Sequence, residues 1–276
     1  MSLSWLHKYQ RKTVAFIGIH AVRIELPNGK VLDEKVITTD ASSSSNWQSA
    51  VDTLDRIIVR ELASLKKKHI ELIVANQFVR YVIAPWTERN LSQEEYGEWI
   101  NMLLEDRFGE SVDTWLSATE RTRFRKSCLA AAISSPLVEL IVSRLKNHGY
   151  HAHSIQPAAI AHLNHHRQQL PDNSNGWFVD ATDTRLAIFT TVNGDWVNVI
   201  NEPMPAHKNT LAAEMISAFR RDAIRWPQLI SGTVYLHCGH PALLEALMRD
   251  FKVVRLIPRL DLPSDNTIRT EEVLCA

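Results

Sequence analysis

One supersecondary pattern occurs twice in this chain and constrains its fold more than any other feature. Each copy has an apolar strand, a short polar break, a second strand, an Asn-Gly turn, a third strand and an amphipathic helix. The copies lie at residues 13–38 and 177–201, their turns at Asn28-Gly29 and Asn193-Gly194, and their helices begin at about Trp47 and Thr210. Asn-Gly between alternating apolar runs predicts a hairpin, because both central residues of a type I′ turn need positive φ. The repetition predicts a duplicated core.

A three-stranded meander followed by a helix is typical of a ribonuclease-H-like core, and two such cores facing each other make the actin-like ATPase fold. We therefore predict an α/β protein of this class. The first lobe is expected over residues 1–174, with a small subdomain inserted at about 78–126, and the second lobe over 175–276. The turn-rich segment Leu170 to Gly176 marks the boundary. In active proteins with this fold, nucleotides bind in the cleft between the lobes.

Composition excludes several functional classes. The chain has 276 residues, and 31 basic side chains balance 31 acidic ones, so no overall field attracts nucleic acid or anionic lipid. No apolar run approaches the roughly 18–20 residues of a membrane helix, and basic residues interrupt residues 1–12 where a signal peptide would need an apolar core. Three scattered cysteines do not make a disulfide framework. We expect a cytoplasmic protein that does not insert into a membrane by itself.

Three segments carry a resemblance to a known family. They are residues 15–26, a strand–turn–strand; residues 78–86, a strand ending in Pro85-Trp86; and residues 128–161, a strand–helix–strand–helix before the second half. In these segments the chain is similar to the PilM-like family of cytoplasmic assembly-platform proteins of type IV pili. It resembles, more distantly, the cytoplasmic part of the type II secretion L component. Within the family it resembles the MshI-like branch, which serves mannose-sensitive-haemagglutinin (MSHA) pili.

This resemblance implies a scaffold that lies in the cytoplasm, peripheral to the inner membrane. Such proteins hold the short cytoplasmic segment of a single-pass, PilN-like inner-membrane partner. They thereby help to couple an assembly motor ATPase, indirectly, to the base of the pilus. A partner of this kind would provide the membrane attachment that the chain itself is not expected to have.

The residues of the expected cleft indicate a degenerate nucleotide site. Phe16 stands where active actin-like ATPases carry an acidic side chain, and an apolar ring cannot orient a magnesium-bound water. The chain has only 9 glycines, whereas phosphate-binding loops use glycine for positive φ and close backbone approach. The candidate cofactor-binding positions are Gly18, His20, Asp180, Thr182, Asp183 and Gly239. We expect no catalytic residue and no bound cofactor.

Alternatives for this cleft stay open. An active actin-like ATPase or small-molecule kinase would use Asp180 and Asp183 with ATP and Mg²⁺, and residual ATP binding without turnover would involve the same residues. The competing interpretation of both aspartates, which we favour, is turn chemistry, in which the carboxylate bonds its own backbone. A ribonuclease-H-type nuclease is a weaker alternative. It needs several convergent carboxylates for two metals, and Phe16 removes the most expected one.

Histidines and tryptophans supply the remaining candidates. His162, His165 and His166 fall at helical spacing, and His237, Cys238 and His240 form a second group. Without a Cys-x-x-Cys bracket, we expect these histidines to be solvent-facing or hydrogen-bonded and to hold no metal. Trp86 and Trp115 stand beside polar breaks and are candidates for a partner groove, since aromatic anchors dominate interfaces. Core packing is the competing interpretation, and we favour it.

Overall fold

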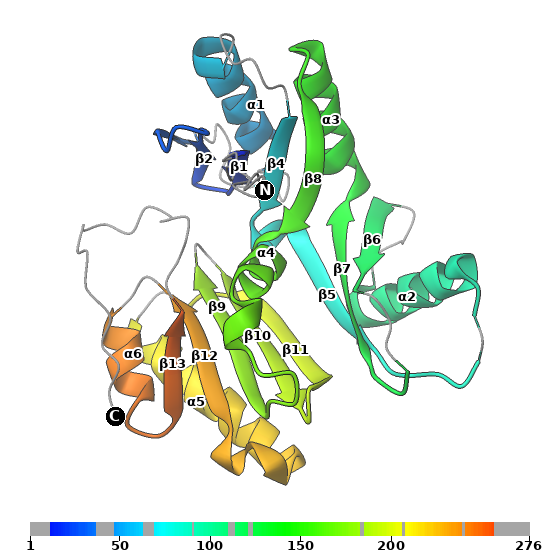
Figure 1. Ribbon diagram of the computed structural model, residues 1–276, viewed down its shortest axis with the longest axis vertical. Helices are drawn as coiled ribbons and strands as arrows, with labels where there is room; N and C mark the ends of the chain where they lie inside the picture. The colour runs from blue at the N-terminus through cyan, green and yellow to red at the C-terminus, as the bar shows by residue number, and fades with distance from the viewer. Residues whose placement is uncertain are drawn as a thin grey trace, which may run out of the picture.

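The computed structural model describes residues 12–36, 47–62, 69–89, 91–109, 114–120, 124–182, 185–205, 208–238 and 241–256. Within these ranges the chain forms two five-stranded sheets and one three-stranded sheet. Figure 1 shows the two larger sheets in separate lobes, with the small sheet and its helix α2 to one side. None of the helices in these ranges is long and apolar enough to cross a membrane.

The first lobe contains the sheet β3-β2-β1-β4-β8. Its strands are β1 (Thr13–Ile17), β2 (Ala21–Glu25), β3 (Val31–Lys35), β4 (His69–Val74) and β8 (His151–Pro157). Helix α1 (Trp47–Ile57) and helix α3 (Ser135–Asn147) belong to this lobe, and α1 continues into a π-helical turn, Ile58–Leu62. Alanine, valine, leucine and isoleucine on one face of α1 are fully buried, as the apolar spacing predicts.

The second lobe repeats this arrangement, which confirms the predicted duplication. Its sheet has the order β11-β10-β9-β12-β13. The strands are β9 (Gly176–Thr182), β10 (Arg185–Val192), β11 (Asp195–Pro203), β12 (Thr233–Cys238) and β13 (Lys252–Leu256), with helices α5 (Lys208–Arg225) and α6 (Pro241–Leu247). In both sheets the first strand of the meander pairs antiparallel with its hairpin partner and parallel with the strand that follows the helix.

The two Asn-Gly turns differ in their backbone conformation. In the β10–β11 turn, Asn193 and Gly194 both have positive φ, 52° and 70°, as the type I′ prediction requires. In the β2–β3 turn only Gly29 has positive φ, 83°, and its N–H donates to the Leu26 carbonyl at 2.9 Å. The prediction of a type I′ turn is therefore wrong for the first copy. Pro27 explains the difference, because its fixed φ suits the second position of a type I turn.

The small subdomain is built from β5 (Val79–Ala84), α2 (Gln93–Phe108), β6 (Trp115–Thr119) and β7 (Cys128–Ser134), with strand order β5-β7-β6. Ser92 and Glu95, whose spacing is typical of a capping box, form one at the start of α2, and Gly109 ends α2 with φ 66°. Strand β6 lies where the sequence predicts no strand. Strand β7 begins after residue 126, the expected end of the insertion, so the small subdomain extends further along the chain than predicted.

Helix α4 (Ala158–His165) connects the lobes and is followed by a 3₁₀ turn, Arg167–Gln169. In Figure 1 it lies beside β9, below the end of β8.

The largest core cluster contains residues of both lobes. Across it, the Tyr81 ring of β5 packs edge-on against the Phe189 ring of β10, with 5.2 Å between ring centres. The lobes are therefore joined by apolar packing.

Candidate functional site

Asp180, near the end of β9, is at the centre of a buried polar network between the lobes. Its side chain is fully buried. Oδ2 accepts a hydrogen bond from Asn76 Nδ2 at 2.8 Å, and Oδ1 lies 3.2 Å from His162 Nδ1 and 3.0 Å from His237 Nδ1. These partners come from the 3₁₀ turn Asn76–Phe78 that follows β4, from α4 and from β12. The expected turn chemistry is wrong for Asp180, because this carboxylate lies within a strand and bonds side chains from three other elements.

Asn76 extends the network into the first lobe and the small subdomain. Its Oδ1 accepts from the Tyr81 hydroxyl at 2.8 Å and from the Ala159 backbone N–H at 3.0 Å. Its carbonyl accepts from Asn201 Nδ2 at 2.9 Å, which reaches across from β11. Burial, followed by the negative charge of Asp180, raises the pKa of Tyr81 well above its usual value, so the phenol stays protonated and donates. The interface between the lobes is thus held by buried side-chain hydrogen bonds.

The charge state of this cluster follows from its environment. Burial by itself would raise the pKa of Asp180, but the charge of His162 and hydrogen bonds from His162 and His237 outweigh it and hold that pKa well below its usual value. Burial lowers the pKa of His237, and the hydrogen bond that its ring donates to Asp180 opposes this only in part. Burial, with neighbouring histidines, lowers the pKa of His166 to about 4. At neutral pH the centre is therefore an ionised carboxylate beside uncharged His166 and His237 rings.

The histidines that the sequence placed in two separate groups meet here. The rings of His162 and His237 lie 3.9 Å apart between centres, and that of His166 lies 5.6 Å from His237. All three are buried. Among the described residues, His237 Nε2 and both ring nitrogens of His166 have no hydrogen-bond partner. The expectation of solvent-facing or hydrogen-bonded histidines is therefore wrong for His166.

The candidate residues of the first strand–turn–strand unit, Gly18 and His20, make backbone hydrogen bonds within that unit. Gly18 donates its N–H to the Ala21 carbonyl at 3.0 Å, and the His20 carbonyl accepts from the Val36 N–H at 2.8 Å. The His20 side chain is exposed. Phe16 is buried in a small apolar cluster with Ala75 and Ala158. Gly18 and His20 thus make hydrogen bonds within their own hairpin.

The other cofactor candidates cannot all be placed. Thr182 is the last residue of β9 and pairs with Arg185 of β10. Asp183 and Gly239 lie outside the described residues. Among the candidate positions whose side chains the structure describes, Asp180 is joined to other buried polar side chains.

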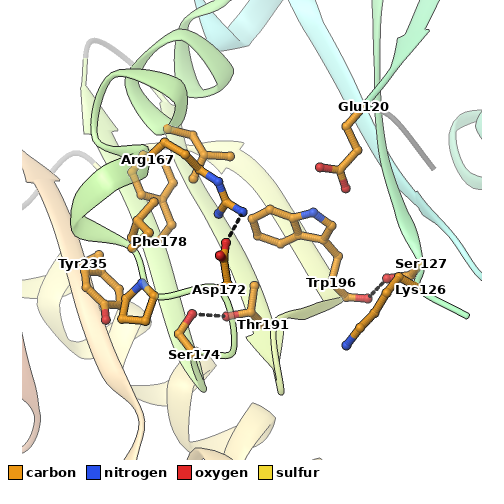
Figure 2. A pocket seen from close by; sticks show the side chains of 14 residues that line it. Glu120, Lys126, Ser127, Arg167, Asp172, Ser174, Phe178, Thr191, Trp196 and Tyr235 are labelled. Atoms are coloured by element: carbon orange, nitrogen blue, oxygen red, sulfur yellow. Dashed lines mark hydrogen bonds and ion pairs between the residues drawn. The ribbon is translucent and has the colours of Figure 1, made fainter. Parts of the chain in front are cut away.

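A pocket opens between the small subdomain and the second lobe (Figure 2). Trp196 lies at its centre, between the Arg167–Asp172 ion pair on one side and Glu120 on the other. Lys126 Nζ donates to the Asn193 carbonyl at 2.9 Å, which ties the subdomain to the β10–β11 turn. The cavity holds about 50 Å³, whereas small-molecule pockets usually measure roughly 300–1,000 Å³. The pocket can therefore accept a side chain but not a nucleotide.

A larger groove of about 330 Å³ follows the neighbouring edge of the second-lobe sheet. Its walls are Ile83 and Pro85 at the end of β5, Arg107 of α2, Ser127, residues 196–199 of β11 and Trp226. Strand β11 is the edge strand of its sheet. Arg107 Nη2 donates to the Val199 carbonyl at 2.7 Å. The groove thus combines apolar walls with the outer edge of a strand.

Trp86 and Trp115, the two candidates for a partner groove, line neither cavity. Trp86 is 37% exposed and packs edge-on against the exposed Phe124 ring, 5.8 Å between centres. Trp115 packs on the small subdomain's core, under the Arg80 guanidinium at 5.0 Å. Trp196 and Trp226 line the groove instead. Their positions in the sequence could have indicated this role. Trp196 lies near the start of an edge strand, and Trp226 directly follows a helix.

Comparison with known proteins decides the fold. No family model matches the chain, and no curated protein does. A protein from Bacteroides thetaiotaomicron with an actin-like ATPase fold and unknown function superposes with a TM-score of 0.58 at 10% identity, over 93% of this chain and 94% of that one. The chain has the actin-like ATPase fold.

Two further solved structures share this actin-like fold. The PilM–PilN type IV pilus biogenesis complex superposes with a TM-score of 0.57 at 13% identity, over 89% of this chain and 88% of that one. The cytoplasmic domain of EpsL, an inner-membrane component of the type II secretion system of Vibrio cholerae, gives a TM-score of 0.51 at 10% identity, over 94% and 88%. At these identities the likeness establishes the fold.

The internal symmetry of the actin-like fold makes Phe16 and Asp180 equivalent. Phe16 pairs with Ile73 of the parallel neighbour β4, and Asp180 pairs with His237 of the parallel neighbour β12. The first half therefore presents an apolar ring at the position where the second half presents a carboxylate. The two halves therefore have the same strand order, but at this equivalent position one side chain is apolar and the other is negatively charged.

Proposed function

We propose that this chain is a cytoplasmic scaffold of a type IV pilus or type II secretion-like assembly platform at the inner membrane, serving MSHA-type pili. In this role it docks an extended cytoplasmic peptide of a single-pass, PilN-like membrane partner. The fold shared with the PilM–PilN complex and with the EpsL cytoplasmic domain supports the proposal, as does the sequence resemblance to PilM-like proteins. Contact with an assembly motor would be indirect, through this partner.

The observation that carries the proposal is the groove beside β11. An edge strand offers unpaired backbone groups to which an extended peptide can add as a further strand, while neighbouring pockets select its side chains. Here the strand edge borders apolar walls formed by Ile83, Pro85 and Trp226. Arg107 donates to the Val199 carbonyl, so this acceptor faces out of the sheet, and a docked peptide would share or replace that hydrogen bond. A mainly apolar, extended segment is the ligand that fits.

The cleft chemistry supports a scaffold that does not turn over nucleotide. Both oxygens of Asp180 interact with protein donors, so a Mg²⁺ ion or its waters would have to displace Asn76 or a histidine. Phe16, on the opposite half, has no atom that can bind a hydrated cation. We therefore propose no catalytic residue and no required cofactor.

Replacing Trp226 by alanine should weaken peptide binding about tenfold or more, because an aromatic wall of the groove is lost. The ligand is a synthetic peptide covering the cytoplasmic segment of a PilN-like single-pass membrane protein, whose gene we expect beside that of this chain, and it is titrated by calorimetry. Ile230→Ala is the matched control, since Ile230 is 79% exposed on the 3₁₀ segment that follows Trp226 and does not line the groove. Equal affinities for Trp226→Ala and wild type, with weakened binding by Trp86→Ala, would move the docking site to the Trp86 surface.

The enzyme alternative makes a separate prediction. A working ATPase or kinase would bind ATP with Mg²⁺ at micromolar concentrations and lose that binding in Asp180→Asn. The scaffold proposal expects calorimetry to show no such binding by the wild-type chain. Micromolar ATP binding that Asp180→Asn abolishes, in a variant with unchanged circular dichroism, would contradict the proposal.

A further inference from the structure

The donor atoms of His162, Asp180 and His237 converge in a way that peptide docking does not require. One donor atom from each residue lies within 4.8 Å of the other two. Asp180 Oδ1 lies 3.2 Å and 3.0 Å from the two Nδ1 atoms. In a tetrahedral zinc site with bonds of about 2.0–2.1 Å, neighbouring ligand atoms stand about 3.3 Å apart. The oxygen-to-nitrogen separations are therefore close to those that one bound ion needs.

We propose that His162, Asp180 and His237 bind one Zn²⁺ ion between the lobes, with water in the fourth position. Two imidazoles and a carboxylate suit zinc, whereas Mg²⁺ and Ca²⁺ take oxygen ligands. The three residues are fixed on α4, β9 and β12, and regular elements hold ligands more accurately than loops do. The ion would join α4 to the second-lobe sheet.

A second observation, independent of the spacing, points to a ligand at this place. His237 and His166 are 1% and 2% exposed, and His237 Nε2 and both nitrogens of His166 lack partners among the described residues. Buried polar atoms without partners are uncommon in native proteins, and each requires an explanation. If zinc takes the lone pair of His237 Nδ1, the ring proton moves to Nε2. Zinc-bound histidines usually donate that proton to a neighbouring group. The His166 ring lies 5.6 Å from that of His237 between centres and is not hydrogen-bonded to it in this structure, so the proposal requires this ring to turn and accept the proton when the ion binds.

The first experiment uses the full chain, stripped with EDTA and then titrated with Zn²⁺ and, separately, with Co²⁺. The expected results are one metal ion per chain, a higher Tm with Zn²⁺ than with EDTA, and the visible absorption of tetrahedral Co²⁺. Failure of the wild-type chain to bind either ion would overturn the proposal, and the group would then be a hydrogen-bonded cluster only. Peptide docking could still be correct in that case, since its groove is elsewhere.

Variants assign the ion to these residues. His237→Gln should remove the Co²⁺ absorption and the Tm rise. His237→Cys should bind Co²⁺ again, with an added sulfur-to-cobalt charge-transfer band, and this variant decides the matter if His237→Gln does not fold.

The control addresses metal bound at the surface. His69, His151 and His153 form an exposed histidine cluster, with ring centres 5.9 and 6.4 Å from His69. The double variant His151→Gln and His153→Gln should leave the stoichiometry and the spectrum unchanged. Loss of the metal in this double variant, with retention in His237→Gln, would show adventitious surface binding and overturn the proposal.

Discussion

Asp180→Ala is expected to lower the Tm by the order of 10 °C. The substitution leaves His162, His237 and Asn76 without their common acceptor in a fully buried position. Removing one partner of a buried charged network costs about 3–5 kcal/mol, and each kcal/mol shifts the Tm of a chain of this size by about 2–4 °C. Thermal unfolding followed by circular dichroism at neutral pH measures the effect.

A matched surface variant makes this test specific. Asp172→Ala removes the carboxylate of an exposed pair with Arg167, whose side chains are 79% and 43% exposed, and such pairs contribute about 0–1 kcal/mol. A Tm loss in Asp180→Ala no larger than in Asp172→Ala would show that the network does not hold the lobes together.

The same substitution should lose its effect in acid. Because the folded-state pKa of Asp180 is lowered, the stability it contributes is present above the ordinary carboxyl pKa of 3.8 and is lost as the pH falls through the folded-state pKa. The Tm difference between wild type and Asp180→Ala should therefore narrow progressively below pH 3.8. A constant difference down to the lowest accessible pH would argue that lost packing, and not lost charge, destabilises the variant.

Gly194→Ala is expected to destabilise the chain by about 3 kcal/mol, near the upper end of ordinary substitutions. Gly194 has φ 70°, and a Cβ there would lie 1.8 Å from the Asp172 carbonyl oxygen, so backbone must move. Gly109→Ala is the control, because Gly109 has φ 66° but nothing within 4 Å of the added carbon. It should lose only about 1–2 kcal/mol, the cost of the left-handed conformation.

Urea unfolding of the two glycine variants separates steric contact from backbone strain. The difference between their unfolding free energies reports the contact between the β10–β11 turn and residues 172–173 of the linker. If the two variants were equally destabilised, that contact would be dispensable, and the turn could move away from the linker at no cost.

The fold could be predicted from the sequence because the information for it is local. Periodicity, the capping box at Ser92 and the repeated strand–turn–strand units determine elements over short distances. Comparing the two copies was enough to predict that their sheets have the same order. The first hairpin turn was mispredicted because Pro27 competes locally with the Asn-Gly signal.

The site could be predicted only in part because it is made by distant residues. Asp180 was a candidate, but its partners Asn76, His162 and His237 come from different elements, and no spacing in the sequence links them. One signal was available, since the carboxyl ends of the parallel strands β9 and β12 meet at one edge of a sheet. Trp86 and Trp115 were chosen for neighbouring polar breaks, a property that does not report on the walls of a groove.

The packing of Tyr81 against Phe189 has a mechanical consequence. Swinging one lobe away from the other would expose both rings and the apolar core around them to water. The molecule should therefore resist a force applied to its edge strand as a rigid body, with the force passing from one sheet to the other through packed side chains. In the proposed scaffold role, this stiffness would let the protein transmit load within an assembly.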